Sequence, residues 1–181
     1  MTTAEEFAEF AEAAYPRLRR TAFLLCGDWH MAEDLAQMTL EKVFVSWRKI
    51  RRQDAVHAYT HRTLVNTCLA HKRLKYTREL VTGWFPERAT EAAAPETRMV
   101  VLDALATLPP RTRAVVVLRY WADLSVEQVA DVLGCSPGNV KRLSAYAMDR
   151  LRTVLGDEMT ESGSPSSAGT EQRSPGSTRH G

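Results

Sequence analysis

The feature that most constrains the fold is a short segment in the last third of the chain, because it specifies two helices and the turn between them. Ser125 and Gln128 have the spacing of a capping box, in which each side chain accepts a hydrogen bond from a backbone N–H at a helix start. Gly134 is expected to end that helix, and Ser136 followed by Pro137 to begin the next. Two short helices joined by a turn of about three residues that includes glycine form a helix-turn-helix motif.

The apolar pattern of the second of these helices gives it an inward and an outward face. The inward residues are Val140, Leu143, Ala147 and Leu151, and the outward stripe is Asn139, Arg142, Tyr146 and Asp149. Such a helix presents its first residues to base edges in the major groove, where Arg142 can read a guanine and Asn139 an adenine. The alternative is a plain helical hairpin with solvated polar residues, which leaves the caps unexplained.

The start of the chain predicts a first helix that ends before residue 28. Thr3 and Glu6 have capping-box spacing, Pro16 is expected to kink or split the helix, and Gly27-Asp28 marks a turn.

Two further helices are expected in the first half of the chain. One has Glu33 and Asp34 in its first turn, where the helix dipole favours acids. Its apolar stripe at helical spacing is Ala32, Ala36, Leu40, Val43 and Trp47. The other is capped by Asp54 and runs to about Lys75. Since no long segment alternates with period two, the predicted fold class is all-α.

The charge distribution divides the chain into segments, although the net charge of its 181 residues is only +2. Nine Lys and Arg stand against one acid between Arg48 and Arg78, and acids prevail in the stretch that follows. The last 26 residues include 16 Gly, Ser, Thr or Pro. Such a segment has too few apolar side chains for their burial to offset the conformational entropy lost on ordering. We therefore expect two small helical domains at 5–78 and 97–155, a flexible linker at 79–96 and a disordered tail at 156–181.

Composition excludes several classes of protein. No apolar run approaches the roughly 18 residues that a membrane span needs, and the acidic N-terminus is no signal peptide. Three separated cysteines fit a reduced, cytoplasmic protein. His57 and His61 are spaced for a metal, but no acid completes a metalloprotease motif. No phosphate loop or nucleophile motif is present, so neither an enzyme, a cofactor nor a metal site is expected.

Two polar surfaces are predicted in the first domain. Asp34, Gln37 and Glu41 form one stripe, which taken alone has the pattern of an ordinary solvated face. Arg62, Asn66 and Arg73 share one side of the next helix. Lys72, Lys75 and Arg78 extend the positive surface, and Tyr59, Tyr76 and Trp84 are interleaved with it. Basic grooves with aromatic side chains hold single-stranded nucleic acid, although a solvated basic face with core aromatics gives the same pattern.

Four segments together resemble the extracytoplasmic-function (ECF) branch of the sigma-70 family, and within it the actinobacterial SigE-like group. They are Ala32-Glu33-Asp34-Leu35-Ala36-Gln37, Leu64-Val65-Asn66-Thr67, Leu108-Pro109-Pro110-Arg111-Thr112-Arg113 and the helix-turn-helix from Leu124 to Lys141. Their order and spacing match from about Phe7 to Leu155.

The resemblance implies an RNA polymerase sigma factor, which binds core polymerase through its β and β′ subunits and directs it to promoter DNA. Region 2 of the family corresponds to 5–78. There Asp34, Gln37 and Glu41 would bind the β′ clamp helices. Asn66 would lie at the pocket for a base flipped from the minus-10 element, completed by the loop Ile50–Val56, while Arg62, Lys72 and Arg73 hold phosphates.

Region 4 of the family corresponds to 97–155, and the resemblance implies that it binds the minus-35 element. The implied contacts are Gly138, Asn139, Lys141, Arg142, Ala145 and Tyr146. Arg142, Leu143 and Tyr146 depart from the serine and arginines common at these positions, which predicts an altered minus-35 sequence. A stand-alone helix-turn-helix regulator is the alternative; it would have an apolar pocket or a self-complementary face and bind duplex DNA without polymerase. The sequence leaves open whether an anti-sigma factor binds between the domains.

Overall fold

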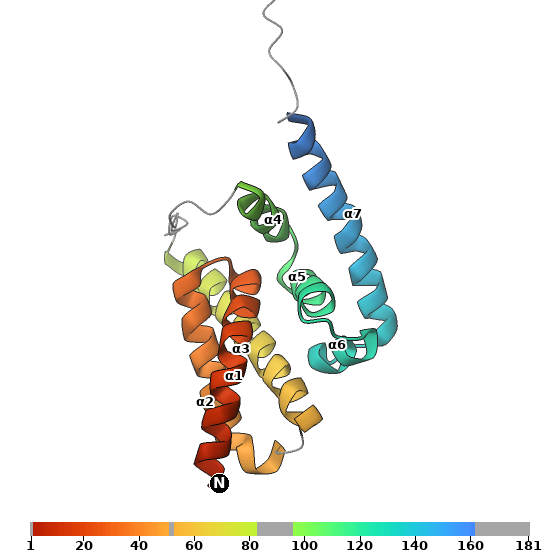
Figure 1. Ribbon diagram of the computed structural model, residues 1–181. Helices are drawn as coiled ribbons and strands as arrows, with labels where there is room; N and C mark the ends of the chain where they lie inside the picture. The colour runs from red at the N-terminus through yellow and green to blue at the C-terminus, as the bar shows by residue number, and fades with distance from the viewer. Residues whose placement is uncertain (1, 51–52, 83–95, 162–181) are drawn as a thin grey trace, which may run out of the picture.

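A computed structural model describes residues 2–50, 53–82 and 96–161, and within these residues every regular element is a helix (Figure 1). The elements are α1 (Thr3–Cys26), α2 (Trp29–Ile50), α3 (Gln53–Thr82), α4 (Glu96–Ala106), α5 (Pro110–Val116), the π-helical turn η1 (Val117–Trp121), α6 (Val126–Leu133) and α7 (Pro137–Glu161). We call α1–α3 the first lobe and α4–α7 the second. The prediction of an all-α fold is confirmed.

The first helix begins one residue earlier than predicted. Its cap is Thr2, whose hydroxyl accepts from the N–H of Glu5 while the Glu5 carboxylate accepts from the N–H of Thr2. The sequence fits the motif in two overlapping registers, and the predicted pair Thr3 and Glu6 is the wrong one. Pro16 does not split the helix. Pro16 is exposed, as is the residue four positions before it, so water can reach the carbonyl that proline leaves without a donor.

The turn between α1 and α2 forms as predicted, but it moves the start of α2. Gly27 adopts φ 81°, a left-handed conformation that glycine reaches without strain. Asp28 then caps α2 by accepting from the N–H of Met31 at 2.7 Å. Because the helix begins at Trp29, Glu33 and Asp34 lie in its second turn, not its first, and the predicted dipole stabilisation at that position is wrong.

The core of the first lobe follows the predicted apolar stripe of α2. Ala32, Ala36, Val43 and Trp47 are buried and Leu40 is half-buried. The outer end of the lobe is aromatic, with Phe7 edge-on to Trp47 at 5.2 Å between ring centroids. Asp54 is not the cap of α3, because that helix already begins at Gln53; its other end lies at Thr82, beyond the predicted Lys75.

The second lobe contains the predicted helix-turn-helix. Ser125 and Gln128 cap α6 reciprocally, with hydrogen bonds of 2.8 and 3.1 Å. Gly134 ends it at φ 59°, and Ser136 accepts from the N–H of Asn139 at the start of α7, where Pro137 is the first residue. α7 extends to Glu161, six residues into the segment predicted as a tail; residues 162–181 lie outside the described part of the chain.

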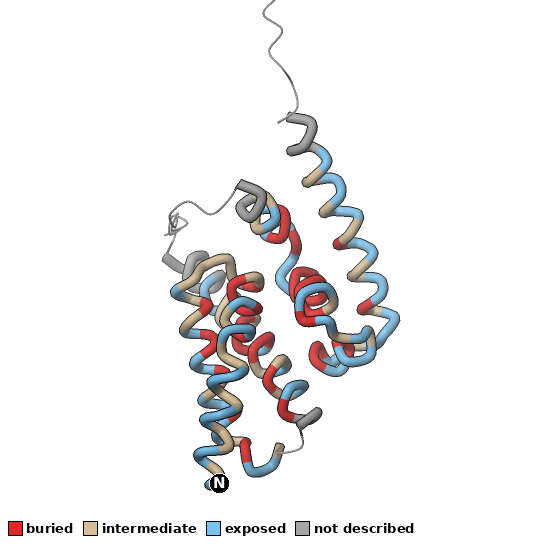
Figure 2. Tube along the Cα trace, viewed as in Figure 1, coloured by how far each residue is buried: buried red, intermediate tan, exposed pale blue. Residues whose placement is uncertain are grey.

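The two lobes pack against each other around one continuous core. Leu18 and Ala22 of α1 and Leu64 of α3 belong to the same buried cluster as Leu118 of η1 and Val129 of α6. Figure 2 shows buried residues on both lobes where they face one another. The sequence predicted two lobes, but it did not predict that their cores would merge.

Candidate nucleic-acid interface

The outward stripe of α7 is exposed as predicted. Val140 and Ala147 are fully buried, and Leu143 and Leu151 half-buried, against the rest of the lobe. The predicted contacts Gly138, Lys141, Arg142, Ala145 and Tyr146 are exposed and Asn139 is half-buried. The Arg142 guanidinium donates from Nη2 to Oδ1 of Asn139 at 2.8 Å. The residues proposed to read bases are therefore coupled to each other.

The predicted acidic stripe of α2 is also exposed along its length, at Asp34, Gln37 and Glu41. The apolar side chains next to it were not predicted from the sequence. Phe44 is 50% exposed and Val45 85% exposed, and Met38 is open to solvent as well. Exposed apolar groups beside polar ones are typical of a surface that docks another protein. The available signal was their position: all three fall outside the buried stripe of α2.

Asn66 is exposed on α3 and lines a groove of about 460 Å³ between α2 and α3. Two cross-helix hydrogen bonds shape this groove. Lys42 Nζ donates to Thr67 Oγ1 at 2.9 Å, and the Ser46 and Tyr59 hydroxyls lie 2.8 Å apart. Lys42 and Ser46 come from the neighbouring helix and were not predicted as part of this site. The loop Ile50–Val56 falls partly outside the described residues.

The predicted phosphate-binding residues of α3 do not share one environment. Arg62, Asn66 and Arg73 are exposed, whereas Lys72 is half-buried. Burial lowers the pKa of Lys72, and the nearby positive charge of Arg113 lowers it further. Lys72 thus faces the second lobe. Tyr76, Arg78 and Trp84, also predicted for this surface, lie where the structure describes no side chains.

The Arg62 side chain is exposed, but it already donates a hydrogen bond to the second lobe. Its Nη2 atom donates to the backbone oxygen of Asp131 in α6, at 2.5 Å. A residue predicted to hold DNA phosphates is therefore in contact with the helix-turn-helix of the other lobe.

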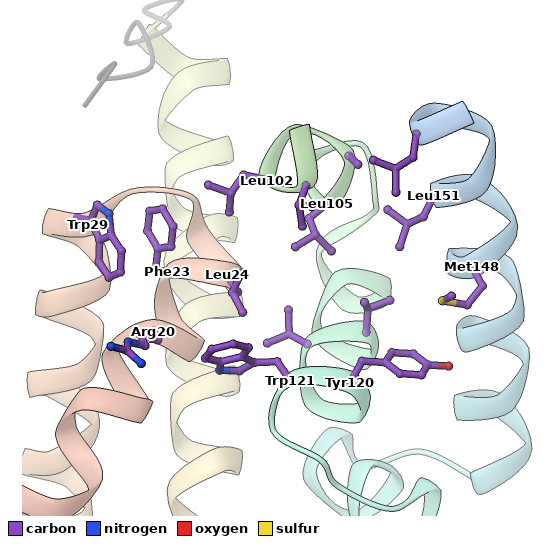
Figure 3. A pocket seen from close by; sticks show the side chains of 15 residues that line it. Arg20, Phe23, Leu24, Trp29, Leu102, Leu105, Tyr120, Trp121, Met148 and Leu151 are labelled. Carbon is purple, nitrogen blue, oxygen red and sulfur yellow. The ribbon is translucent and has the colours of Figure 1, made fainter. Parts of the chain in front are cut away.

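An apolar groove of about 940 Å³ lies between the lobes (Figure 3). Phe23, Leu24 and Trp29 line it from the first lobe, and Leu105 and Trp121 from the second. Trp121 is 42% exposed. A groove of this size and composition fits an apolar helix or a loop of a protein partner.

The described residues contain no group of three His, Cys, Asp or Glu placed to hold a metal ion. His61 Nδ1 donates to the backbone oxygen of His57 at 3.0 Å, so this ring nitrogen has a structural partner. Among the described helices, none combines the length and hydropathy that crossing a membrane requires.

Comparison with known protein families finds two matches. Residues 10–76 match the model for sigma-70 region 2, and residues 104–153 match that for sigma-70 region 4. The RNA polymerase sigma-E factor of Streptomyces coelicolor is 34% identical over 152 residues, which are 83% of this chain and 86% of the relative. The ECF RNA polymerase sigma factor SigL of Mycobacterium tuberculosis is 32% identical over 145 residues, 76% of this chain and 82% of the relative.

The same fold is found in a solved structure of a sigma factor. It is the sigma factor RpoE in complex with the anti-sigma factor NepR, from Bartonella quintana. The TM-score is 0.73 at 24% sequence identity, and the alignment covers 84% of this chain and 98% of that one.

Proposed function

This chain belongs to the ECF branch of the sigma-70 family of RNA polymerase sigma factors, and on that premise we propose how its two lobes divide promoter recognition. It is a transcription initiation factor and not an enzyme; its partners are core RNA polymerase and promoter DNA. Its place of action is the cytoplasm, where it works as a subunit of the polymerase.

The first lobe docks on core polymerase through α2. Asp34, Gln37 and Glu41 supply hydrogen-bond acceptors and charge, and the β′ subunit is the partner that the family resemblance implies. The neighbouring Phe44 and Val45 add apolar area, which stabilises association as it is removed from water. In such a surface the apolar side chains contribute affinity, and the polar and charged ones fix how the two proteins are aligned.

The observation that carries the proposal is the groove between α2 and α3, with Asn66 exposed on its wall. A base flipped out of the minus-10 duplex needs a pocket that offsets a few kcal/mol of unstacking. The amide of Asn66 can both donate to and accept from a base edge. Lys42, which donates to Thr67 across the groove, places a positive charge beside the path of the phosphates.

The second lobe binds the minus-35 element through the outward stripe of α7. Lys141 and Arg142 are exposed near its N-terminal end, where a helix carries partial positive charge that favours phosphate. The proposed division of labour is that Lys141 contacts the backbone while Asn139 and Arg142 read base edges.

The apolar groove between the lobes is the proposed binding site for a second protein partner. Its lining residues Phe23 and Trp121 come from opposite lobes. An amphipathic helix of an anti-sigma factor, the class of partner seen with RpoE, would bury its apolar face there. The alternative of a stand-alone regulator also expects an apolar pocket, but it does not explain why region 2 and region 4 match in one chain.

The deciding experiment combines the protein with core polymerase and a library of promoter sequences, followed by sequencing of the transcripts. We expect initiation at a defined pair of elements that depends on the added chain. No promoter-dependent initiation from a folded sample would overturn the proposal.

Two variants separate the proposed roles. Asn66→Ala is expected to bind core polymerase normally, to fail on duplex promoters and to recover on a promoter with an unpaired minus-10 segment. Asp34→Ala is expected to lose core binding and to fail on both templates. Glu9→Ala, which removes an exposed acid from α1, is the matched control for charge.

A further inference from the structure

Among the described residues of α3, Leu74 is the large apolar side chain most open to solvent. It is 68% exposed, and it packs into none of the hydrophobic clusters found among the described residues. A single exposed leucine needs no explanation by itself. The informative feature is the position of Leu74 on α3, next to the groove proposed to bind a flipped base.

Leu74 continues a row of side chains that begins in the groove between α2 and α3. Asn66 and Ala70 are exposed and both line that groove. Leu74 lies one helical turn beyond Ala70 on the same side, since residues four apart are neighbours on a helix. At a rise of about 1.5 Å per residue, Leu74 is about 6 Å from Ala70 and about 12 Å from Asn66 along α3. Because bases are about 3.4 Å apart along a strand, Leu74 lies about two to four base steps from a base bound in the groove.

Cationic side chains flank Leu74 on both sides. Arg73 and Lys75 are exposed, and each is rotated by about 100° from Leu74 around the helix axis. Contacts from such side chains to phosphates fix the register of a helix on duplex DNA without reading its sequence. The chain has no acidic residue between Asp54 and Glu79, so no carboxylate of this stretch repels the DNA backbone.

An apolar side chain between phosphate contacts has one specific partner on the base edges of duplex DNA. The 5-methyl group of thymine is the apolar group displayed in the major groove, and apolar side chains recognise it by direct contact. Leucine has no hydrogen-bond donor or acceptor in its side chain, so it cannot read the polar edges of the other bases. Contact with thymine would remove apolar area of both groups from water.

We propose that Leu74 is a specificity-determining residue, which selects a thymine in the duplex just upstream of the base bound near Asn66. This inference rests on the proposed role of the groove between α2 and α3 in binding the minus-10 element. The upstream side is expected for two reasons. DNA downstream of the flipped base belongs to the melted segment, and the chain continues from α3 to the lobe proposed to bind the minus-35 element.

The test removes the two partners of the contact separately and together. The DNA is one promoter from the transcript library, prepared with thymine at each position in turn within about six base pairs upstream of the melted segment, on either strand. A second set carries deoxyuridine at the same positions, which lacks the 5-methyl group and is otherwise identical. Core polymerase is combined with the native full-length chain, with Leu74→Ala or with Leu74→Met, and the rate of initiation is measured. Urea unfolding checks that the variants fold, as expected for changes at an exposed side chain.

With the native chain, loss of the methyl group at one position is expected to reduce initiation about fourfold, the effect of exposing one buried carbon group. In Leu74→Ala the same loss should have little effect. Leu74→Met keeps an apolar side chain of similar volume and should restore the dependence on the methyl group. Lys75→Ala is the contrasting variant, because loss of a phosphate contact should weaken initiation by a similar factor on every promoter and leave the thymine preference in place.

An equal dependence on the methyl group in the native chain and in Leu74→Ala would overturn the proposal. The absence of any such dependence in the native chain would overturn it as well. In both cases initiation itself continues, so the proposed sigma function is unaffected. Failure of the native chain to initiate on any promoter would instead overturn the proposed function, and this inference with it.

Discussion

On the outward face of α7, Oδ1 of Asn139 accepts a hydrogen bond from Nη2 of Arg142 at 2.8 Å, one turn along the helix. An asparagine that reads adenine uses its oxygen to accept from the base and its amide to donate. Arg142 already occupies that oxygen. Adenine recognition by Asn139 therefore competes with the hydrogen bond between Asn139 and Arg142. Arg142, in contrast, keeps further N–H donors for a guanine.

Arg142→Ala should change minus-35 preference in two ways. The preference for guanine at the position that Arg142 reads should fall by about 1–3 kcal/mol, and the freed Asn139 should gain a preference for adenine. Transcript sequencing from a minus-35 library with core polymerase measures both. Arg150→Ala, an exposed arginine farther along α7, should leave the preference unchanged. An unchanged preference in Arg142→Ala would show that this pair does not read bases.

Gly134→Ala should destabilise the protein by about 1 kcal/mol, since an L-residue is strained in a left-handed conformation. Gly134 has φ 59°, and no atom lies within 4 Å of an added Cβ, so backbone conformation alone causes the loss. Gly134→Asn should cost less because asparagine tolerates this region. Urea unfolding measures the free energy. Equal losses for the two variants would point to a different cause.

Gly138→Ala should separate stability from DNA binding. Gly138 is helical, and the nearest atom to an added Cβ is Ser136 Oγ at 4.0 Å, so alanine should stabilise α7 by about 0.5 kcal/mol. If DNA approaches this backbone closely, the added methyl group should reduce initiation from minus-35-dependent promoters. Thermal unfolding and transcription assays on one sample give both values. Full initiation would remove Gly138 from the proposed interface.

Stability should fall in mild acid because of His61. Burial lowers the pKa of His61 from its ordinary value of 6.5, and nearby positive charges of His57 and Arg17 lower it further. The unfolded chain then binds more protons below pH 6.5, so the free energy of unfolding falls as pH drops. Urea unfolding at about pH 7.5 and about pH 5.5 should show a smaller drop for His61→Gln than for the native chain. His30→Gln, at an exposed position, is the control.

The Cys68 thiol should resist modification in the folded protein. Burial raises its pKa to about 11, so little reactive thiolate is present in mildly alkaline buffer. Burial raises the pKa of Cys26 as well. Mass spectrometry after treatment with iodoacetamide should find Cys135 modified first and Cys68 last. All three should react in guanidinium chloride. Early modification of Cys68 in the folded state would contradict its buried position.

Local signals predicted the elements whose stabilising contacts lie within a few residues. The capping box of Ser125 and Gln128 and the turn at Gly134 are set by neighbours in sequence. Prediction failed where two local solutions compete. Thr2 and Thr3 both fit a cap. Asp28 caps α2, so that helix begins at Trp29 and Glu33 lies beyond its first turn. The start of each helix therefore depended on which hydrogen bonds the folded chain makes.

The sequence by itself determined the helical class, the helix-turn-helix and the polar faces of α2 and α7, because periodicity and capping act over one or two turns. Only the tertiary structure decided how the lobes meet. Arg62 and Asp131 are 69 residues apart, and no local pattern encodes their contact. The same holds for Lys72, which the sequence places on a basic surface and the packing places beside Arg113. Long-range contacts depend on how several helix faces fit together, and that fit exists only in the folded chain.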